Sequence, residues 1–372
     1  MRRSPHGTTG LERSVHVDLG ERSYTIEIGV DVLGKVGPEI SRRTGASRAM
    51  IVTVPPVGRR YGPRVMRSLR EAGIKARRFD VPDGERTKNL RQVSSLYDAF
   101  LDAGADRATA VVALGGGVVG DLSGFVAATL LRGLPVVQIP TTLLAMVDSS
   151  VGGKTGVNVP RGKNLVGAFH QPRFVWMDVT TLRSLPPRHL VSGMAELIKH
   201  GAIRDAAFFE RLEVDLERVM NLEPECLIPA LERSCAIKAD VVRQDERESG
   251  LRMILNFGHT VGHAVEALSR YRGILHGEAV AIGMAFAAQR SETLGLSPTG
   301  TAERLMALLR RAGLPTEQPI FSRSAYLQAL RVDKKKREAR IRFVALRGIG
   351  RAETVPLLPR EIIPPIRAKA RR

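Results

Sequence analysis

Short apolar segments alternate with helical ones through the first 180 residues, and this alternation restricts the fold more than any other feature of the chain. Strands are predicted at residues 49–54, 75–81, 108–114, 136–140 and 174–178, helices at 61–72, 89–103 and from residue 121, and a β-hairpin at 15–19 and 24–28. Strands that alternate with helices predict a parallel sheet in a doubly wound α/β domain.

The pattern changes after Pro186-Pro187. Long amphipathic helices are predicted at residues 190–203, 207–220, 224–242, 254–268, 278–294 and 301–312, followed by a hairpin of residues 340–346 and 353–357. A chain of 372 residues fits two domains at roughly 150 residues each. We therefore expect an α/β domain at residues 1–180 and a mostly helical domain at 181–372.

Composition excludes several classes of protein. A hydrophobic fraction of 43% with 26% charged residues is typical of a folded, soluble chain. Cys226 and Cys235 are the two cysteines, which argues against a disulfide framework and favours a reducing compartment. The basic N-terminus is not followed by an apolar stretch, and charged and helix-breaking residues interrupt the apolar region at 122–147. We therefore expect a cytoplasmic protein without a secretory signal or a membrane span.

The net charge of +19 raises the possibility of an anionic partner. Basic runs at 334–337 and 367–372 are more typical of solvated tails than of binding surfaces. The chain has no segment in which aromatic and basic residues are interleaved, as in proteins that bind single-stranded nucleic acid. Arginine supplies 46 of the 57 basic residues and lysine 11. Six of the lysines fall within the motifs described below, which favours an anion-handling active site over a diffuse basic surface: Lys88, Lys154, Lys163, Lys199, Lys238 and Lys334.

A glycine cluster joins the predicted strand at 108–114 to a helix. Gly115, Gly117 and Gly120 match the G-x-G-x-x-G pattern, in which missing side chains let a backbone approach a pyrophosphate at a helix N-terminus. The alternative is a tight strand–helix turn. No acidic residue ends a strand about 20 residues later, so the pattern indicates an unusual nucleotide fold. Two other segments follow strands: residues 82–88, where Glu85 could hold a ribose hydroxyl and Lys88 a phosphate, and Thr141-Thr142.

The sequence Gly-Gly-Lys-Thr at residues 152–155 suggests a P-loop. That motif requires a glycine at position 148, where Asp148 stands, so the P-loop interpretation is rejected. The segment is predicted instead to be a glycine-flexed loop that presents Lys154, Lys163 and Asn164.

Histidines and a carboxylate in the helical half have the composition of a metal site. His259 and His263 stand at i and i+4, hence on one helix face, and His276 follows at the start of the next helix. Glu196 lies on an otherwise apolar helix face, with Lys199 one turn later. Two imidazoles and one carboxylate are typical of catalytic zinc, whereas a lone histidine is more often a core residue. Spacing alone does not decide which two histidines bind.

Seven motifs in order resemble those of the 3-dehydroquinate synthase family, of the sugar-phosphate cyclase superfamily. They are Gly-Gly-Gly-Val-Val-Gly-Asp, Pro-Thr-Thr-Leu-Leu-Ala, Asp-Ser-Ser-Val-Gly-Gly-Lys-Thr, Gly-Lys-Asn, Ala-Glu-Leu-Ile-Lys-His-Gly, Asn-Phe-Gly-His-Thr-Val-Gly-His and Leu-His-Gly-Glu. The resemblance runs from about Val15 to Leu357. It implies a Rossmann-like NAD-binding α/β domain and a helical domain that binds metal and substrate.

The resemblance also implies an activity. Members of the family are lyases of the shikimate pathway that convert 3-deoxy-D-arabino-heptulosonate 7-phosphate to 3-dehydroquinate and phosphate. They use NAD+ catalytically and a divalent metal, usually Zn²⁺ with Co²⁺ as an alternative, and are generally cytoplasmic homodimers. Their partner is a small anionic sugar phosphate, and neither nucleic acid nor membrane is expected.

By motif, the resemblance assigns residues to three groups. The metal ligands implied are Glu196, His259 and His276. The NAD contacts implied are Asp83, Gly84, Glu85, Arg86, Thr87, Lys88, Gly117, Val118, Val119, Gly120, Asp121, Thr141, Thr142, Lys154, Lys163, Thr181, Leu182, Arg183 and Ser184. The substrate-binding and catalytic residues implied are Arg132, Asp148, Lys154, Asn164, Lys199, Lys238, Arg252, Asn256, His263 and Lys334.

Two positions depart from the family pattern. Val54 stands where many members have an acidic or amide residue for the adenosine ribose, and Ser184 replaces a common threonine while keeping the hydroxyl.

Two other enzymes are alternatives. A cyclase of the inosose or valiolone type would alter the residues that hold the substrate carboxylate, whereas Lys238, Arg252 and Asn256 are present here. A metal-dependent polyol dehydrogenase would release NADH stoichiometrically.

Overall fold

The computed structural model describes residues 12–270, 273–319, 321–332 and 340–364. The chain divides into two compact units that are discontinuous in sequence. Unit 1 comprises Met1–Leu190 and Arg218–Arg243, and unit 2 comprises Val191–Glu217 and Gln244–Arg372. The domain boundary expected at residue 180 remains a prediction.

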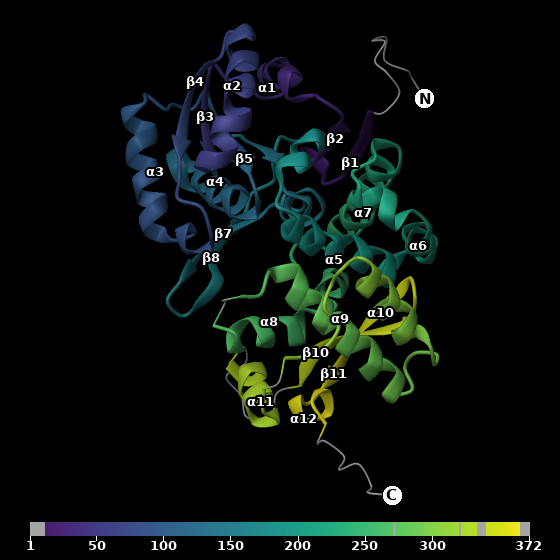
Figure 1. Cartoon of the computed structure of the whole chain (residues 1–372). Coiled ribbons are helices and arrows are strands. Elements are labelled where there is room, and N and C mark those ends of the chain that lie inside the picture. Colours follow the sequence, from purple (N-terminus) through teal and green to yellow (C-terminus); the bar gives the residue numbers. More distant parts are fainter. Residues whose placement is uncertain (1–11, 271–272, 320, 333–339, 365–372) are drawn as a thin grey trace, which may run out of the picture. The chain divides into compact units, whose positions relative to one another are not determined.

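A seven-stranded sheet forms the centre of unit 1 (Figure 1). Its order is β1-β2-β9-β6-β5-β3-β4, in which β1 and β2 pair antiparallel and the other neighbours pair parallel. The strands are β1 (Arg13–Val17), β2 (Tyr24–Gly29), β3 (Arg48–Thr53), β4 (Lys75–Asp80), β5 (Thr109–Gly115), β6 (Val136–Pro140) and β9 (Phe174–Asp178). The predicted doubly wound α/β fold and its N-terminal hairpin are confirmed.

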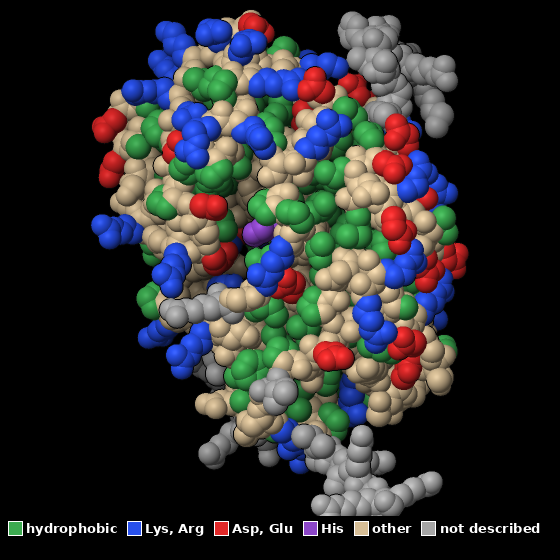
Figure 2. Space-filling view, viewed as in Figure 1, with side chains coloured by type: hydrophobic (Ala, Val, Ile, Leu, Met, Phe, Trp, Pro, Cys, Tyr) green, Lys and Arg blue, Asp and Glu red, His purple; other side chains and the backbone are tan. Residues whose placement is uncertain are grey.

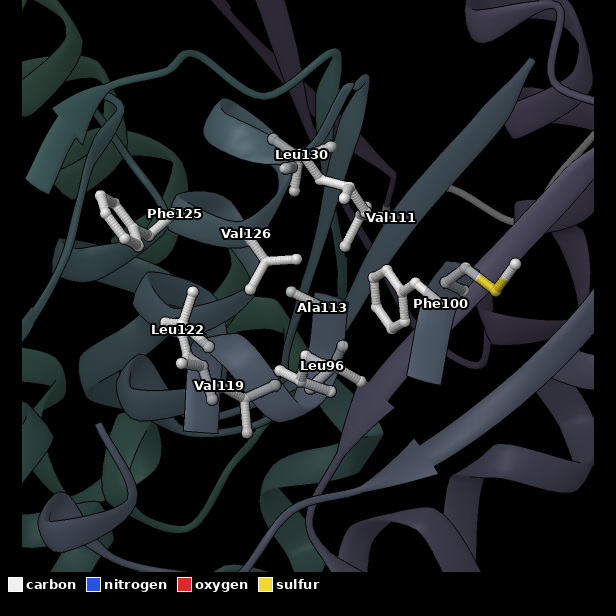
Figure 3. Packing of buried hydrophobic residues seen from close by; sticks show 14 of the residues in the cluster. Leu96, Phe100, Val111, Ala113, Val119, Leu122, Phe125, Val126 and Leu130 are labelled. Carbon is white, nitrogen blue, oxygen red and sulfur yellow. The ribbon is translucent and has the colours of Figure 1, made fainter. Parts of the chain in front are cut away.

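Helices cover both faces of this sheet, because alternate residues of its strands point in opposite directions. The helices are α1 (Val36–Thr44), α2 (Pro55–Glu71), α3 (Leu90–Asp102) and α4 (Gly117–Thr129). In β5, Val111 and Ala113 pack with α3 and α4, as Figure 3 shows. Ala110, Val112 and Leu114 join the cluster on the other face, which includes residues of α1 and α2. A fifth helix, α7 (Pro224–Gln244), also belongs to unit 1.

The segment predicted as a glycine-flexed loop is a β-hairpin, so that prediction is wrong. Strands β7 (Lys154–Val159) and β8 (Gly162–Phe169) pair antiparallel, with Gly156 opposite Gly167. A Cβ on Gly167 would lie 2.2 Å from the carbonyl oxygen of Thr155, so the two strands approach where no side chain fits. Glycines that indicated a loop in the sequence instead allow close strand pairing.

Some helix boundaries also differ from prediction. Helix α2 begins at Pro55, six residues earlier than expected, because proline suits the first turn of a helix. Helix α4 begins at Gly117 and not at residue 121. Helix α1 was not predicted.

Unit 2 is mostly helical, as predicted. Its described elements are the part of α5 (Pro187–Arg204) from Val191 onward, α6 (Ala206–Met220), α8 (His259–Leu268), α9 (His276–Thr293), α10 (Thr301–Arg311), α11 (Arg323–Val332), α12 (Pro359–Ile362) and the hairpin β10 (Ile341–Gly348) with β11 (Arg351–Leu357). The late hairpin is confirmed. Helix α8 is shorter than expected, because Leu251–Asn256 forms a 3-10 helix, and α11 was not predicted.

Figure 2 shows Lys and Arg side chains spread over one face of the molecule, with acidic side chains among them. Unit 2 contains ion pairs at its surface: Arg304 lies 2.6 Å from Glu213, and Arg311 lies 2.9 Å from Glu217. Exposed pairs of this kind stabilise a fold by about 0–1 kcal/mol each. The basic runs at 334–337 and 367–372 lie outside the described residues.

The cysteines and the apolar helices were also interpreted from the composition. Cys226 and Cys235 are both buried and form no disulfide, and burial raises the pKa of the Cys235 thiol to about 12. Among the described helices, none is long and apolar enough to cross a membrane.

Candidate active site

The glycine turn of unit 1 leaves the backbone without side chains between β5 and α4. Strand β5 ends at Gly115 and α4 begins at Gly117, where a Cβ would lie 3.0 Å from the hydroxyl of Ser149. The hydroxyls of Ser149 and Thr141 are buried, and neither has a hydrogen-bond partner within the described part of the chain. Free backbone N–H groups at a helix start and unpaired buried hydroxyls fit a pyrophosphate-bearing cofactor such as NAD.

Lys88 connects three of the segments that the sequence singled out. Its buried ammonium group contacts the Asp121 carboxylate of α4 and lies 2.5 Å from Oδ1 of Asn164 on β8. Burial raises the pKa of the Asp121 carboxyl, and the adjacent Lys88 ammonium partly offsets this effect. The Asn158 side chain donates to Oε1 of Glu85 over 2.7 Å. Residues 82–88, the start of α4 and the β7–β8 hairpin are therefore brought together.

The remaining residues predicted to contact NAD differ in what they can offer. Asp83, Gly84, Glu85 and Arg86 are exposed, Lys163 is half-buried, and Thr87 is buried. Val119 packs into the core, so it presents only its backbone to a ligand. Thr142 accepts the N–H of Ala145, and Ser184 lies 2.6 Å from the hydroxyl of Tyr61. Thr181 donates to the carbonyl of Asp178, so the hydroxyls of this segment bond within the protein.

Lys238 and Asp148 form a second ion pair within unit 1. The buried ammonium group of Lys238, on α7, donates to the side chain and the carbonyl of Asp148. Together with Lys88 and Lys199, it makes three buried lysines that each contact a carboxylate. A buried charge is stable only with such compensation. Of the six lysines that the sequence singled out, these three are buried and paired, whereas Lys154 is exposed and Lys163 is half-buried.

Arg132 and Lys154 are exposed. Arg132 follows Leu131, and both have left-handed backbone conformations, with φ of 66° and 50°. Non-glycine residues adopt this region at an energetic cost, and such strain clusters at functional sites.

Three side chains in unit 2 have the geometry of a metal centre. The candidate ligand atoms of Glu196, His259 and His276 all lie within 4.8 Å of one another. Glu196 on α5 is fully buried, and neither carboxylate oxygen accepts a hydrogen bond of ordinary geometry from the described residues. Lys199 forms an ion pair with Oε2, and Nε2 of His259 lies 4.0 Å from Oε1. A buried carboxylate and two imidazoles fit a divalent metal such as zinc.

Two glycine contacts bring these ligands together. A Cβ on Gly277 would lie 1.8 Å from the carbonyl oxygen of Ser192, so α9 meets α5 at backbone distance one turn before Glu196. A Cβ on Gly283 would lie 1.9 Å from the carbonyl oxygen of Gly258, so α9 also meets the start of α8. His276 and His259 immediately neighbour these contacts. This role was not predicted from the sequence, although glycines inside otherwise good helices are the signal for it.

His263 lies beside the cluster and is not among the residues whose candidate ligand atoms lie within 4.8 Å of one another. Its ring centroid is 5.3 Å from that of His259 and 6.3 Å from that of His276. The grouped atoms belong to the set that the family resemblance implied, and this ligand assignment remains a proposal.

Arg252 and Asn256 lie on the 3-10 helix Leu251–Asn256. Arg252 is buried and donates to the carbonyl of Glu246, while the Asn256 amide lies 2.5 Å from Oε1 of Glu248. Lys334 lies outside the described residues.

Asp245 holds the turn before Arg252, a role that was not predicted from the sequence. Its carboxylate accepts the backbone N–H groups of Ser249, Gly250 and Arg252 over 2.9, 2.7 and 3.0 Å. Burial acts to raise the pKa of Asp245, but these N–H donors outweigh it and lower the pKa to about 2. Aspartate followed by Ser-Gly within five residues is the available sequence signal, since short polar side chains cap turns.

We expect the turn at 245–252 to stay closed at neutral pH and to open in strong acid. Because the folded pKa is depressed, the stabilisation is complete above the ordinary value of 3.8 and is lost as the pH falls toward about 2. Hydrogen exchange of peptides covering 245–256, corrected for intrinsic rates, measures this. Asp245→Asn should raise exchange there already at pH 6, and identical exchange in both proteins would contradict the assignment.

Comparison with known proteins agrees with this geometry. Residues 78–192 match the model of the 3-dehydroquinate synthase N-terminal family, and residues 193–336 match the 3-dehydroquinate synthase C-terminal family. A curated 3-dehydroquinate synthase from Geotalea uraniireducens is 50% identical over 337 residues, which are 91% of this chain and 94% of the relative.

Solved structures of two sugar-phosphate cyclases have folds similar to that of this chain. A 2-deoxy-scyllo-inosose synthase, complexed with carbaglucose-6-phosphate, NAD+ and Co²⁺, has a TM-score of 0.86 at 29% identity and covers 94% of this chain and 98% of its own. A 2-epi-5-epi-valiolone synthase from Streptomyces hygroscopicus, with NAD+ and Zn²⁺ bound, has a TM-score of 0.83 at 28% identity over 97% of both chains.

The fold, the residues around Lys88 in unit 1 and the cluster of Glu196, His259 and His276 in unit 2 define a sugar-phosphate cyclase. Among these enzymes, the greater identity lies with the synthases that make dehydroquinate and not with the inosose or valiolone types. The chain belongs to the 3-dehydroquinate synthase family, whose members are lyases.

Proposed function

We propose that the protein converts 3-deoxy-D-arabino-heptulosonate 7-phosphate to 3-dehydroquinate and phosphate, with NAD+ and a divalent metal as cofactors. The observation that carries the proposal is the cluster of Glu196, His259 and His276, in a chain 50% identical to a curated enzyme of this activity. Zn²⁺ is the metal proposed, with Co²⁺ as the alternative. A cytoplasmic homodimer is part of the same proposal.

NAD+ is assigned to unit 1. The start of α4 provides backbone N–H groups for the pyrophosphate, and the buried hydroxyl of Thr141 provides an unused hydrogen-bonding group. Lys88 adds positive charge at a fixed position, because Asp121 and Asn164 hold its ammonium group. NAD+, when bound, supplies a reversible hydride acceptor. Val54 is buried ahead of α2, and its side chain offers the adenosine ribose no polar group.

The charge of the proposed substrate is consistent with the number of cations among the residues proposed to bind it. A phosphate monoester and a carboxylate together carry about 2.5 to 3 negative charges at neutral pH. Arg132, Lys154, Asn164, Lys199, Lys238, Arg252, Asn256 and, outside the described residues, Lys334 are the groups proposed to replace their hydration. Charge-assisted hydrogen bonds of this kind are stronger than neutral ones.

The proposed bond changes involve the substrate and the nicotinamide: the carbinol hydride removed in the oxidation would go to bound NAD+ and return to the substrate in the reduction. Oxidation of a secondary alcohol gives a ketone, which acidifies the neighbouring C–H and permits β-elimination of phosphate. Reduction, ring opening and an intramolecular aldol step then close the carbocycle. A divalent metal bound by Glu196, His259 and His276 supplies Lewis acidity toward the substrate hydroxyls. Because Glu196 is committed as a ligand, the substrate's own phosphate is proposed as the base.

Phosphate release from purified protein tests the proposal. With the heptulosonate phosphate, NAD+ and Zn²⁺, we expect phosphate and dehydroquinate without net NADH, and no reaction after chelation. Stoichiometric NADH would instead indicate a polyol dehydrogenase. Turnover of a different sugar phosphate, with none of this substrate, would indicate an inosose or valiolone synthase.

Lys154→Ala should lower kcat/KM by about 100-fold or more while the protein stays folded and metal-loaded. Lys154 is exposed at the first position of β7, so truncation removes charge from the substrate site without opening the core. Lys75→Ala, at the exposed first position of β4, is the matched control and should leave turnover unchanged. Wild-type kinetics in Lys154→Ala would show that the hairpin does not bind substrate.

A further inference from the structure

A carboxylate that none of the motif assignments includes lies beside the metal cluster. Glu266 is on α8, seven residues after His259 and three after His263, so all three occupy one helix face. Its Oε1 lies 3.5 Å from Nδ1 of His276, the first residue of α9. Its side chain is 8% exposed. The face that carries His259 therefore also brings a buried carboxylate to His276.

We propose that Glu266 is the positioning residue for His276: its carboxylate accepts the Nδ1–H of the imidazole and directs Nε2 toward the metal. This inference rests on the proposed metal centre and names the group that orients one of its ligands. The two ring nitrogens face opposite sides of the imidazole, so a carboxylate at Nδ1 leaves Nε2 as the coordinating atom.

Electrostatics favour this pairing. A carboxylate removed from water requires a positive or strongly polar partner, and the N–H of a metal-bound imidazole is such a donor. The carboxylate in turn fixes the tautomer of the histidine and raises its basicity as a ligand. A contraction of less than about 1 Å from the present 3.5 Å would give an ordinary hydrogen bond.

A second carboxylate near His276 already has another task. Oε2 of Glu278 accepts the backbone N–H of Leu275 over 2.8 Å, which caps the first turn of α9. Glu278 thus fixes the helix start that carries His276, and Glu266 on the neighbouring helix is placed to fix the ring.

Metal binding without turnover provides the test. Co²⁺ affinity is measured by competition with a chromogenic chelator, and the geometry of the site by the Co²⁺ absorption spectrum, for the full-length protein and three variants. We expect about 10-fold weaker binding in Glu266→Gln, which keeps an acceptor but loses the charge, and about 100-fold weaker binding in Glu266→Leu. Both should alter the Co²⁺ spectrum. Asp215→Asn, at a buried carboxylate of unit 2 that pairs with Arg211, is the control and should change neither.

The outcomes separate this inference from the metal proposal. Wild-type protein that binds no Co²⁺ would overturn both. Wild-type binding with equal affinity and an unchanged spectrum in the Glu266 variants would overturn only the role of Glu266. Should Glu266→Leu fail to fold, Glu266→Gln decides by the same two measurements. A graded loss of affinity, from wild type through Gln to Leu with circular dichroism preserved, supports the assignment because a merely structural role would leave the Co²⁺ spectrum unchanged.

Discussion

Glu196→Gln is expected to eliminate stoichiometric metal binding and to lower the free energy of unfolding by about 3–5 kcal/mol. The substitution keeps the size of a fully buried side chain but replaces a charged ligand with an amide. It also leaves the buried ammonium group of Lys199 without the carboxylate that it contacts. Elemental analysis of the purified protein measures the metal, and denaturant unfolding measures stability.

A double variant separates the two effects of this change. Glu196→Gln combined with Lys199→Met removes the buried charge as well, so much of the stability should return while the metal stays absent. Glu213→Gln, which breaks an exposed pair with Arg304, is the control and should cost no more than about 1 kcal/mol. Full zinc occupancy in Glu196→Gln would show that the cluster has another ligand set.

Gly277→Ala should cost about 3 kcal/mol or more and disrupt metal binding at the same time. The new methyl group would lie 1.8 Å from the carbonyl oxygen of Ser192, and a backbone atom cannot rotate away as a flexible side chain does. Helices α5 and α9 would have to separate, which moves Glu196 away from His276.

Thermal unfolding and Co²⁺ titration together measure this effect. Gly34→Ala is the control, since its new Cβ would meet only the Arg64 side chain, at 3.4 Å or more. A Gly277→Ala protein with wild-type stability and Co²⁺ affinity would contradict the close contact of α5 with α9.

The pattern of apolar residues along the chain predicted most helices and strands of the fold. The central strands of the parallel sheet follow from short continuous apolar runs, because helices bury both faces of that sheet. The long helices of unit 2 follow from apolar residues repeated about every 3.6 positions. The turn between β5 and α4 follows from Gly115 and Gly117. The β7–β8 hairpin does not, because glycine has the same local preferences in a loop and in a closely paired strand.

The residues of the candidate site, like the elements of the fold, were predicted only in part from the sequence. The sequence by itself determined which residue types were present: a few lysines among many arginines, histidines clustered near one another, and Glu196 on an apolar helix face. The tertiary structure decided how they group, placing His276 with Glu196 and His259, Glu266 beside His276, and Asp245 under the turn that carries Arg252. Local periodicity cannot encode these choices, because contacts between helices such as α5, α8 and α9 depend on backbone approach at glycines far apart in the chain.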